Sequence, residues 1–302
     1  MTRIPNKSTT DLPELHLQLL KAAAPERAAE LAQLVEAANI EIVPASDRQG
    51  FQLGTAFGAI VVGHRSPAAS WLVTCAAWNC VTAYSPALLL TDKLSSRDIA
   101  AMPGQAEHVA KVAQCLAAAR ALLALHDTET FMWPDGVPAP EQSSTSKSDE
   151  FAQDIAHIAW AFMLLHEIKH AQLWATGAQP ENLIEEERIC DAFAVDHLLD
   201  DVDRYAAENG KPSELVRDLR AMGVVTGLFL VAILGHDTSS SHPPAQERFD
   251  LLLRRMDGHP VKWFVLYAAA LLLGALDMRQ RPIDLRNFTS DCTGLSALTA
   301  LL

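Results

Sequence analysis

Five consecutive residues, His166-Glu167-Ile168-Lys169-His170, contain two imidazoles and a carboxylate at a spacing that can bind and use a metal ion. If the segment is helical, the two histidines lie one turn apart on the same face and can bind one zinc ion. Glu167 is then placed to act as general base on an attacking water molecule. The alternative is a chance match on a helix whose histidines only make structural hydrogen bonds.

The flanking sequence favours a helix that presents both imidazoles on one face. Ile158, Phe162, His166, His170 and Trp174 recur at intervals of four, which is the spacing of one helical stripe. A metal ion held by two histidines needs a third protein ligand, and the acidic segment after this helix can supply one.

Glu187 is the favoured third ligand among the acidic residues that follow. On a helical wheel it aligns with Asp191 and with two apolar residues further along, so this face is expected to be buried. Two carboxylates on a buried face need partners, and Asp191 is suited to orient a ligating histidine. Glu185 and Glu186 are instead expected to form a solvated helix start, stabilised by the helix dipole.

A third motif is the run His242-Pro243-Pro244-Ala245-Gln246-Glu247-Arg248, whose simplest interpretation is the beginning of a helix. The order and spacing of H-E-x-x-H, E-x-x-x-D and H-P-P-x-x-E-R resemble the gluzincin zinc metallopeptidases. They are similar to the CaaX-prenyl-protease and HtpX type, and most similar to the Lit-type phage-exclusion peptidases.

This resemblance covers residues 151–255 and implies a role for each matching residue. Glu187 would be the third zinc ligand beside the two histidines, and Asp191 would support the site. His242 would lie near the substrate and stabilise the tetrahedral intermediate, whereas Arg248 would be a conformational anchor. The resemblance also implies a zincin-like core, a protein or peptide substrate, and cleavage of a host protein during phage infection.

The remaining sequence favours an α+β fold that is predominantly α. Short β-branched pieces at 40–43 and 59–62 predict a small sheet in the N-terminal part. The segment 71–90 is apolar throughout and is compatible with either helix or strand. Helices are expected in two pieces of 11–38, at 105–126, and at 149–175, 181–208, 212–234, 244–257 and 261–279.

The composition of 127–148, with three prolines and a serine-rich run, predicts a mobile surface loop between two portions of the chain. Residues 1–126 would then form a helical portion with the small sheet, available for substrate recognition. Residues 149–302 would form the helical zinc metallopeptidase core.

The net charge of −13, without a basic cluster, excludes nucleic acid as an expected partner. Five cysteines without a C-x-x-C pair and a polar N-terminus predict a cytoplasmic protein. The apolar runs 221–235 and 263–276 fall short of the about 18–20 residues that a membrane span needs, so core helices are expected. Two alternatives stay open: a metal-containing binding or regulatory module without proteolysis, and a membrane-associated gluzincin. The oligomeric state is not indicated.

Overall fold

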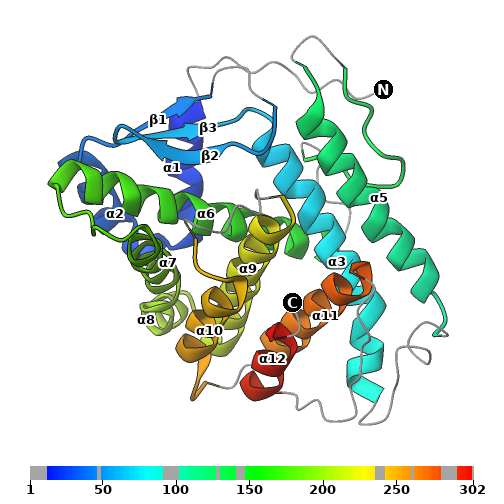
Figure 1. Ribbon diagram of the computed structural model, residues 1–302. Helices are drawn as coiled ribbons and strands as arrows, with labels where there is room; N and C mark the ends of the chain where they lie inside the picture. Colours follow the sequence, from blue (N-terminus) through cyan, green and yellow to red (C-terminus); the bar gives the residue numbers. More distant parts are fainter. Residues whose placement is uncertain are drawn as a thin grey trace.

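The computed structural model describes residues 12–45, 49–90, 102–126, 130–140, 147–234, 242–259, 262–279 and 291–300. These residues form a mostly helical structure with one three-stranded sheet (Figure 1), which confirms the predicted predominantly α, α+β class. A 3₁₀ turn, η2, spans Pro25–Arg27. The helices are α1 (Leu12–Ala23), α2 (Ala28–Ala37), α3 (Ser66–Leu90), α5 (Gln105–Ala124), α6 (Lys147–Thr176), α7 (Leu183–Leu199), α8 (Val202–Glu208), α9 (Ser213–Leu234), α10 (Ala245–Met256), α11 (Lys262–Met278) and α12 (Cys292–Thr299).

The sheet has the strand order β1-β3-β2, so within the described part of the chain β2 has a strand neighbour on one side only. Strand β1 (Glu41–Pro44) pairs in parallel with β3 (Ala59–Val62), and β2 (Leu53–Ala56) pairs antiparallel with β3. The sequence predicts β1 and β3 but misses β2, because four residues that include a glycine carry little strand signal.

Helix α6 crosses the middle of the molecule, with the sheet over one side of it (Figure 1). It contacts β2 on that side, α7 and α9 on others, and α3 along its N-terminal half. Every residue from 158 to 166 is buried. The two turns of α6 that lead into the H-E-x-x-H sequence are therefore packed on all sides, and the core fixes where His166 begins the motif.

Close contact between α6 and α9 depends on two glycines of α9. A Cβ atom at Gly223 would lie 2.4 Å from Ile158 Cγ2, and one at Gly227 would lie 2.8 Å from Phe162 Cδ1. Both contacts are closer than carbon atoms can pack. The two helices can therefore approach at this distance only because α9 has no side chain at these positions.

Several expectations differ from the structure. The single helix expected at 181–208 is broken, since α7 ends at Leu199 and α8 begins at Val202. Arginine side chains bond to carbonyls of the last α7 turn: Arg27 Nη1 donates to Asp196 O, and Arg220 Nη1 donates to Leu198 O. The ambiguous segment 71–90 is helical, within α3, and α12 was not predicted.

The loop predicted at 127–148 lies partly outside the described residues, which omit 127–129 and 141–146. Its mobility and the division of the chain at this point stay predictions.

The two apolar runs form parts of α9 and α11, and most of their described residues are buried in the core. A different helix, spanning Ser66–Leu89, is long and apolar enough to cross a membrane by length and composition, yet 56% of its most apolar window is buried inside the protein. Core helices of soluble proteins meet the same criterion, so this is weak evidence for a membrane span.

Replacing Gly223 by alanine should lower the free energy of unfolding by about 1–3 kcal/mol, because the added methyl group meets Ile158 and the backbone of α6. The matched control is Gly54→Ala, where the new Cβ meets no atom within 4 Å, and the change should stay within about 0.5 kcal/mol. Urea unfolding followed by circular dichroism measures both. Equal midpoints for the two variants would contradict the close approach of α9 to α6.

Candidate metal centre and cleft

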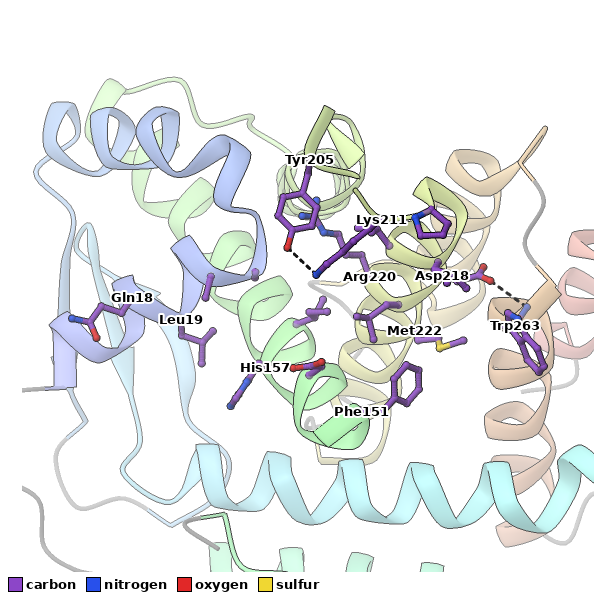
Figure 2. Close-up of a pocket in the computed structure, with 18 of the residues that line it drawn as sticks. Gln18, Leu19, Phe151, His157, Tyr205, Lys211, Asp218, Arg220, Met222 and Trp263 are labelled. Atoms are coloured by element: carbon purple, nitrogen blue, oxygen red, sulfur yellow. Dashed lines mark hydrogen bonds between the residues drawn. The ribbon is translucent and has the colours of Figure 1, made fainter. Parts of the chain in front are cut away.

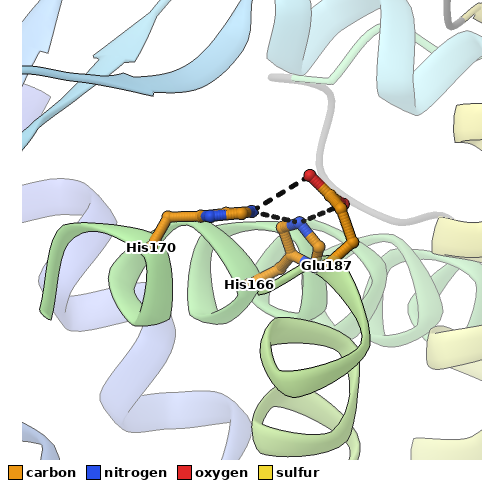
Figure 3. A group of neighbouring side chains, drawn as sticks. All are labelled: His166, His170 and Glu187. Carbon is orange, nitrogen blue, oxygen red and sulfur yellow. Dashed lines mark hydrogen bonds and ion pairs between the residues drawn. The ribbon is translucent and has the colours of Figure 1, made fainter. Parts of the chain in front are cut away.

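Three side chains from two helices converge on one another (Figure 3). His166 and His170 project from α6 toward Glu187 of α7. Their Nε2 atoms lie 3.1 Å apart, Glu187 Oε2 lies 3.2 Å from His166 Nε2, and Glu187 Oε1 lies 3.3 Å from His170 Nε2. The sequence predicted these three residues as a group, and the structure brings them together.

The other ring nitrogen of each histidine is occupied by a carboxylate. His166 Nδ1 donates to Asp191 Oδ1 at 3.0 Å, and His170 Nδ1 donates to Glu186 Oε1 at 2.7 Å. A proton held at Nδ1 leaves the Nε2 lone pair available to a metal ion, and such carboxylate partners fix the orientation of the ring.

The group could therefore hold a metal ion, and its geometry fits one. Glu187 Oε2 is buried and has no hydrogen-bond partner among the described residues, although it faces His166 Nε2. A tetrahedral ion with ligands at about 2.0–2.1 Å sets its ligand atoms about 3.3 Å apart, close to the separations of these nitrogen and oxygen atoms. Two imidazoles and a carboxylate are also a ligand set that zinc accepts.

Glu186 corrects an expectation from the sequence. It was predicted to be solvated with Glu185, but only 7% of Glu186 is exposed, and it supports His170. Glu185 is exposed, as predicted, and pairs with Arg188 on the surface. Helix α6 crosses α7 at this turn and covers Glu186, which the helical wheel of α7 alone does not indicate.

Asp191 is held from a third helix by Arg248. The guanidinium group donates from Nε to Asp191 Oδ2 at 2.7 Å and from Nη2 to Oδ1 at 2.5 Å. Both side chains are almost completely buried. Burial alone would raise the pKa of Asp191, but Arg248 and His166 lower it, so this carboxylate stays charged.

The carboxylates also control the protonation of the histidines. Burial alone would lower the pKa of His166, but its contacts with Asp191 and Glu187 raise it to about 10. Burial also acts to lower the pKa of His170, but its hydrogen bond with Glu187 acts to raise it, and the net shift of the pKa is upward. Burial acts upward on the pKa of Glu187, yet the two histidines lower it well below its usual value. Without a metal ion the carboxylates therefore favour protonated histidines, and a metal ion that bound here would displace those protons.

Glu167 lies on the side of α6 that faces the sheet. The hydroxyl of Thr55 in β2 lies 2.9 Å from Glu167 Oε2 and 3.0 Å from the Glu167 carbonyl oxygen. Thr55 therefore orients the carboxylate and also ties the edge strand to the helix. Thr55 could not be predicted as a site residue, because it and Glu167 are separated by 112 positions of the chain.

A cleft of about 290 Å³ opens between β2 and α6 beside these residues. Its lining includes Glu167, His170, Glu186 and Glu187, with His242 from the segment before α10. The Nε2 atom of His242 lies 3.5 Å from Glu187 Oε1, and 53% of the side chain is exposed. His242 thus reaches the cleft from the solvent side, opposite the buried Asp191.

A larger cavity of about 870 Å³ lies elsewhere, between α1, α6, α9 and Trp263 of α11 (Figure 2). Its lining is mainly apolar and includes no residue of the His166 group. Among its polar side chains, Lys211 Nζ bonds to Tyr205, and Asp218 Oδ2 accepts from the Trp263 backbone, whereas Asp218 Oδ1 is buried without a hydrogen-bond partner among the described residues. Glu167 and His170 of the H-E-x-x-H sequence line the smaller cleft, which is therefore the candidate site.

Replacing Arg248 by methionine should lower the free energy of unfolding of metal-free protein by about 3–5 kcal/mol, because the Asp191 charge is left buried without its partner. Arg188→Met is the matched control, since Arg188 also joins α7 to α10, through Glu247, but at the exposed surface. Its loss should change stability little. Denaturant unfolding in the presence of a chelator compares the two, and an equal loss in both variants would refute a special role for the buried pair.

Comparison with known proteins places the chain in a family. A model of the Peptidase U49 family, which is the Lit type, matches residues 60–270, more than half of the chain. The match begins well before residue 151, where the motif resemblance starts, so it includes α3, α5 and most of β3. Neither the curated proteins nor the solved structures include a significant match. The chain therefore belongs to the Peptidase U49 family.

Proposed function

We propose that this peptidase is a zinc-dependent endopeptidase with a zincin-like site, in which His166, His170 and Glu187 hold the metal ion. The observation that carries the proposal is the convergence of these side chains, with an orphaned carboxylate oxygen, in a cleft that also contains Glu167. When bound, zinc polarises the substrate carbonyl and lowers the pKa of water.

In this proposal Glu167 is the general base. It takes a proton from the attacking water as the oxygen adds to the peptide carbonyl carbon, and it returns the proton to the leaving amine when the C–N bond breaks. The Thr55 hydroxyl holds Glu167 toward the cleft during both transfers. Water supplies the new C–O bond, and the products are one carboxylate and one amine.

His242 is proposed to donate a hydrogen bond to the oxyanion that forms on the carbonyl oxygen. Its position on the exposed side of the cleft, near Glu187, supports this role. Arg248 lies six residues after His242, in α10, and its bond to Asp191 anchors that helix. Its proposed role is only to position the segment that bears His242.

An extended peptide is the expected substrate form. Strand β2 is an edge strand, and its residues 53–55 line the cleft, so a peptide can pair with its unpaired side and pass over the metal ligands. The same pairing would select a flexible or unfolded segment of a protein over a folded helix.

The cellular role we propose follows the Lit-type resemblance: cleavage of a host protein in the cytoplasm during phage infection. A binding module without proteolysis is the main alternative, but it leaves the Thr55-oriented Glu167 without a purpose. A membrane-associated peptidase is the other alternative, and purification without detergent would distinguish it.

Metal content tests the ligand set directly. Purified wild-type protein should contain one zinc ion per chain by elemental analysis, whereas His166→Ala and Glu187→Ala should lose it because only two ligands remain. Glu167→Gln should keep its zinc and lose peptide cleavage by at least about 100-fold, since the general base is absent. Wild-type protein that neither contains nor takes up zinc would overturn the proposed function.

Glu186 and Glu185 form a natural pair for the supporting interaction. Glu186→Ala should weaken zinc affinity about 10–100-fold, because His170 loses the carboxylate that orients it. Glu185→Ala, one residue away and exposed, should bind zinc like the wild type. Competition with a chromogenic chelator measures both affinities, and equal values would show that Glu186 does not support the metal centre.

A further inference from the structure

An apolar rim lies at one end of the cleft and has no part in the chemistry proposed above. We define the apolar rim as Leu53 of β2, Phe57 in the β2–β3 turn and Trp174 of α6, all of which line the cleft. Trp174 lies one turn beyond His170 on the same stripe of α6. The rim is therefore next to the metal ligands, where a substrate side chain adjacent to the scissile bond would lie.

Phe57 occupies a position that the fold alone disfavours. It is 91% exposed, so its ring contributes almost nothing to the core. Its φ angle is +52°, in the left-handed region that an aromatic residue rarely adopts. Phe57 and Gly58 are the two central residues of the hairpin turn, and with positive φ at both, asparagine followed by glycine is the favoured pair.

Trp174 is fixed against the same turn. A Cβ atom at Gly58 would lie 2.5 Å from Trp174 Cε3, so the indole ring packs directly on the glycine backbone. Even so, 49% of Trp174 stays exposed. The turn thus holds one aromatic ring in place beside the cleft while it presents a second ring to solvent.

From these observations we infer that the apolar rim is a specificity subsite that binds a large apolar side chain of the substrate, close to the bond that is cleaved. This inference rests on the proposed peptidase function. Two exposed aromatic rings at a cleft lose contact with water only when an apolar group covers them. The rest of the cleft lining is polar and would bind the peptide backbone and the reacting groups.

At Phe57 the effect of a substitution on peptide binding can be distinguished from its effect on stability. Phe57→Asn restores the favoured turn pair, so the protein should be at least as stable as the wild type while the subsite is lost. If Phe57 instead served folding, the Phe57→Asn variant would be less stable than the wild type and would bind peptides equally well. Phe57→Leu keeps an apolar side chain and should preserve most of the substrate preference.

The experiment measures peptide binding separately from cleavage. Zinc-loaded Glu167→Gln protein is applied to an array of decapeptides in which each position in turn carries Phe, Leu, Ala, Lys or Glu. At one position, Phe and Leu should be favoured over Ala. The added change Phe57→Asn should weaken binding of those peptides about tenfold, the lower end of what burial of one aromatic ring contributes, without lowering the melting temperature.

Met132→Asn in the same background is the matched control, because Met132 is 64% exposed but does not line the cleft. Its binding pattern should be unchanged. No bound peptide, no apolar preference, a preference for Lys, or a preference that survives Phe57→Asn would each overturn the inference. The wild-type enzyme is then given the bound peptides: if it leaves them intact, the proposed hydrolysis fails while the subsite stands.

Discussion

The rest of the site depends on the hydrogen bonds that the buried carboxylate of Asp191 accepts. It accepts hydrogen bonds from His166 on α6 and from Arg248 on α10, and it projects from α7. One buried anion thus fixes three helices relative to each other. Because a charge in the interior is tolerated only with partners on every side, the arrangement has little freedom. The same carboxylate orients the His166 ring and anchors α10, the helix that follows the segment bearing His242.

Helix α6 has to satisfy two opposing requirements. Its first half is packed against α9 closely enough to need Gly223 and Gly227 on the partner, as in any apolar core. Its second half carries histidines and a glutamate that must reach a polar cleft. The edge strand resolves the conflict, because β2 covers this half of the helix with Thr55 and leaves the rest open to solvent.

Much of this arrangement could be predicted from the sequence because it depends on local spacing. The helix expected at 149–175 is observed at Lys147–Thr176, and the inward face of α7 that carries Glu187 and Asp191 is buried as the helical wheel indicates. Glu186 and Thr55 could not be predicted, since each acts through a contact with α6 that depends on how α6 lies against α7 and β2. The break after Leu199 was also not predicted, and the arginines that bond to the last α7 carbonyls come from η2 and α9.

Those arginines have a consequence for the N-terminal part of the chain. Arg27 of η2 bonds to the carbonyl of Asp196, while Arg220 bonds to that of Leu198 and, through a buried ion pair, to Glu26. The C-terminal end of α7 is therefore fastened to the first thirty residues, and its N-terminal end carries the carboxylate of the metal group. A ligand or protein that separated η2 from α7 would release the C-terminal end of α7 from these contacts. The N-terminal helices are in this sense part of the scaffold that holds α7 and its Glu187, although none of their side chains lines the cleft.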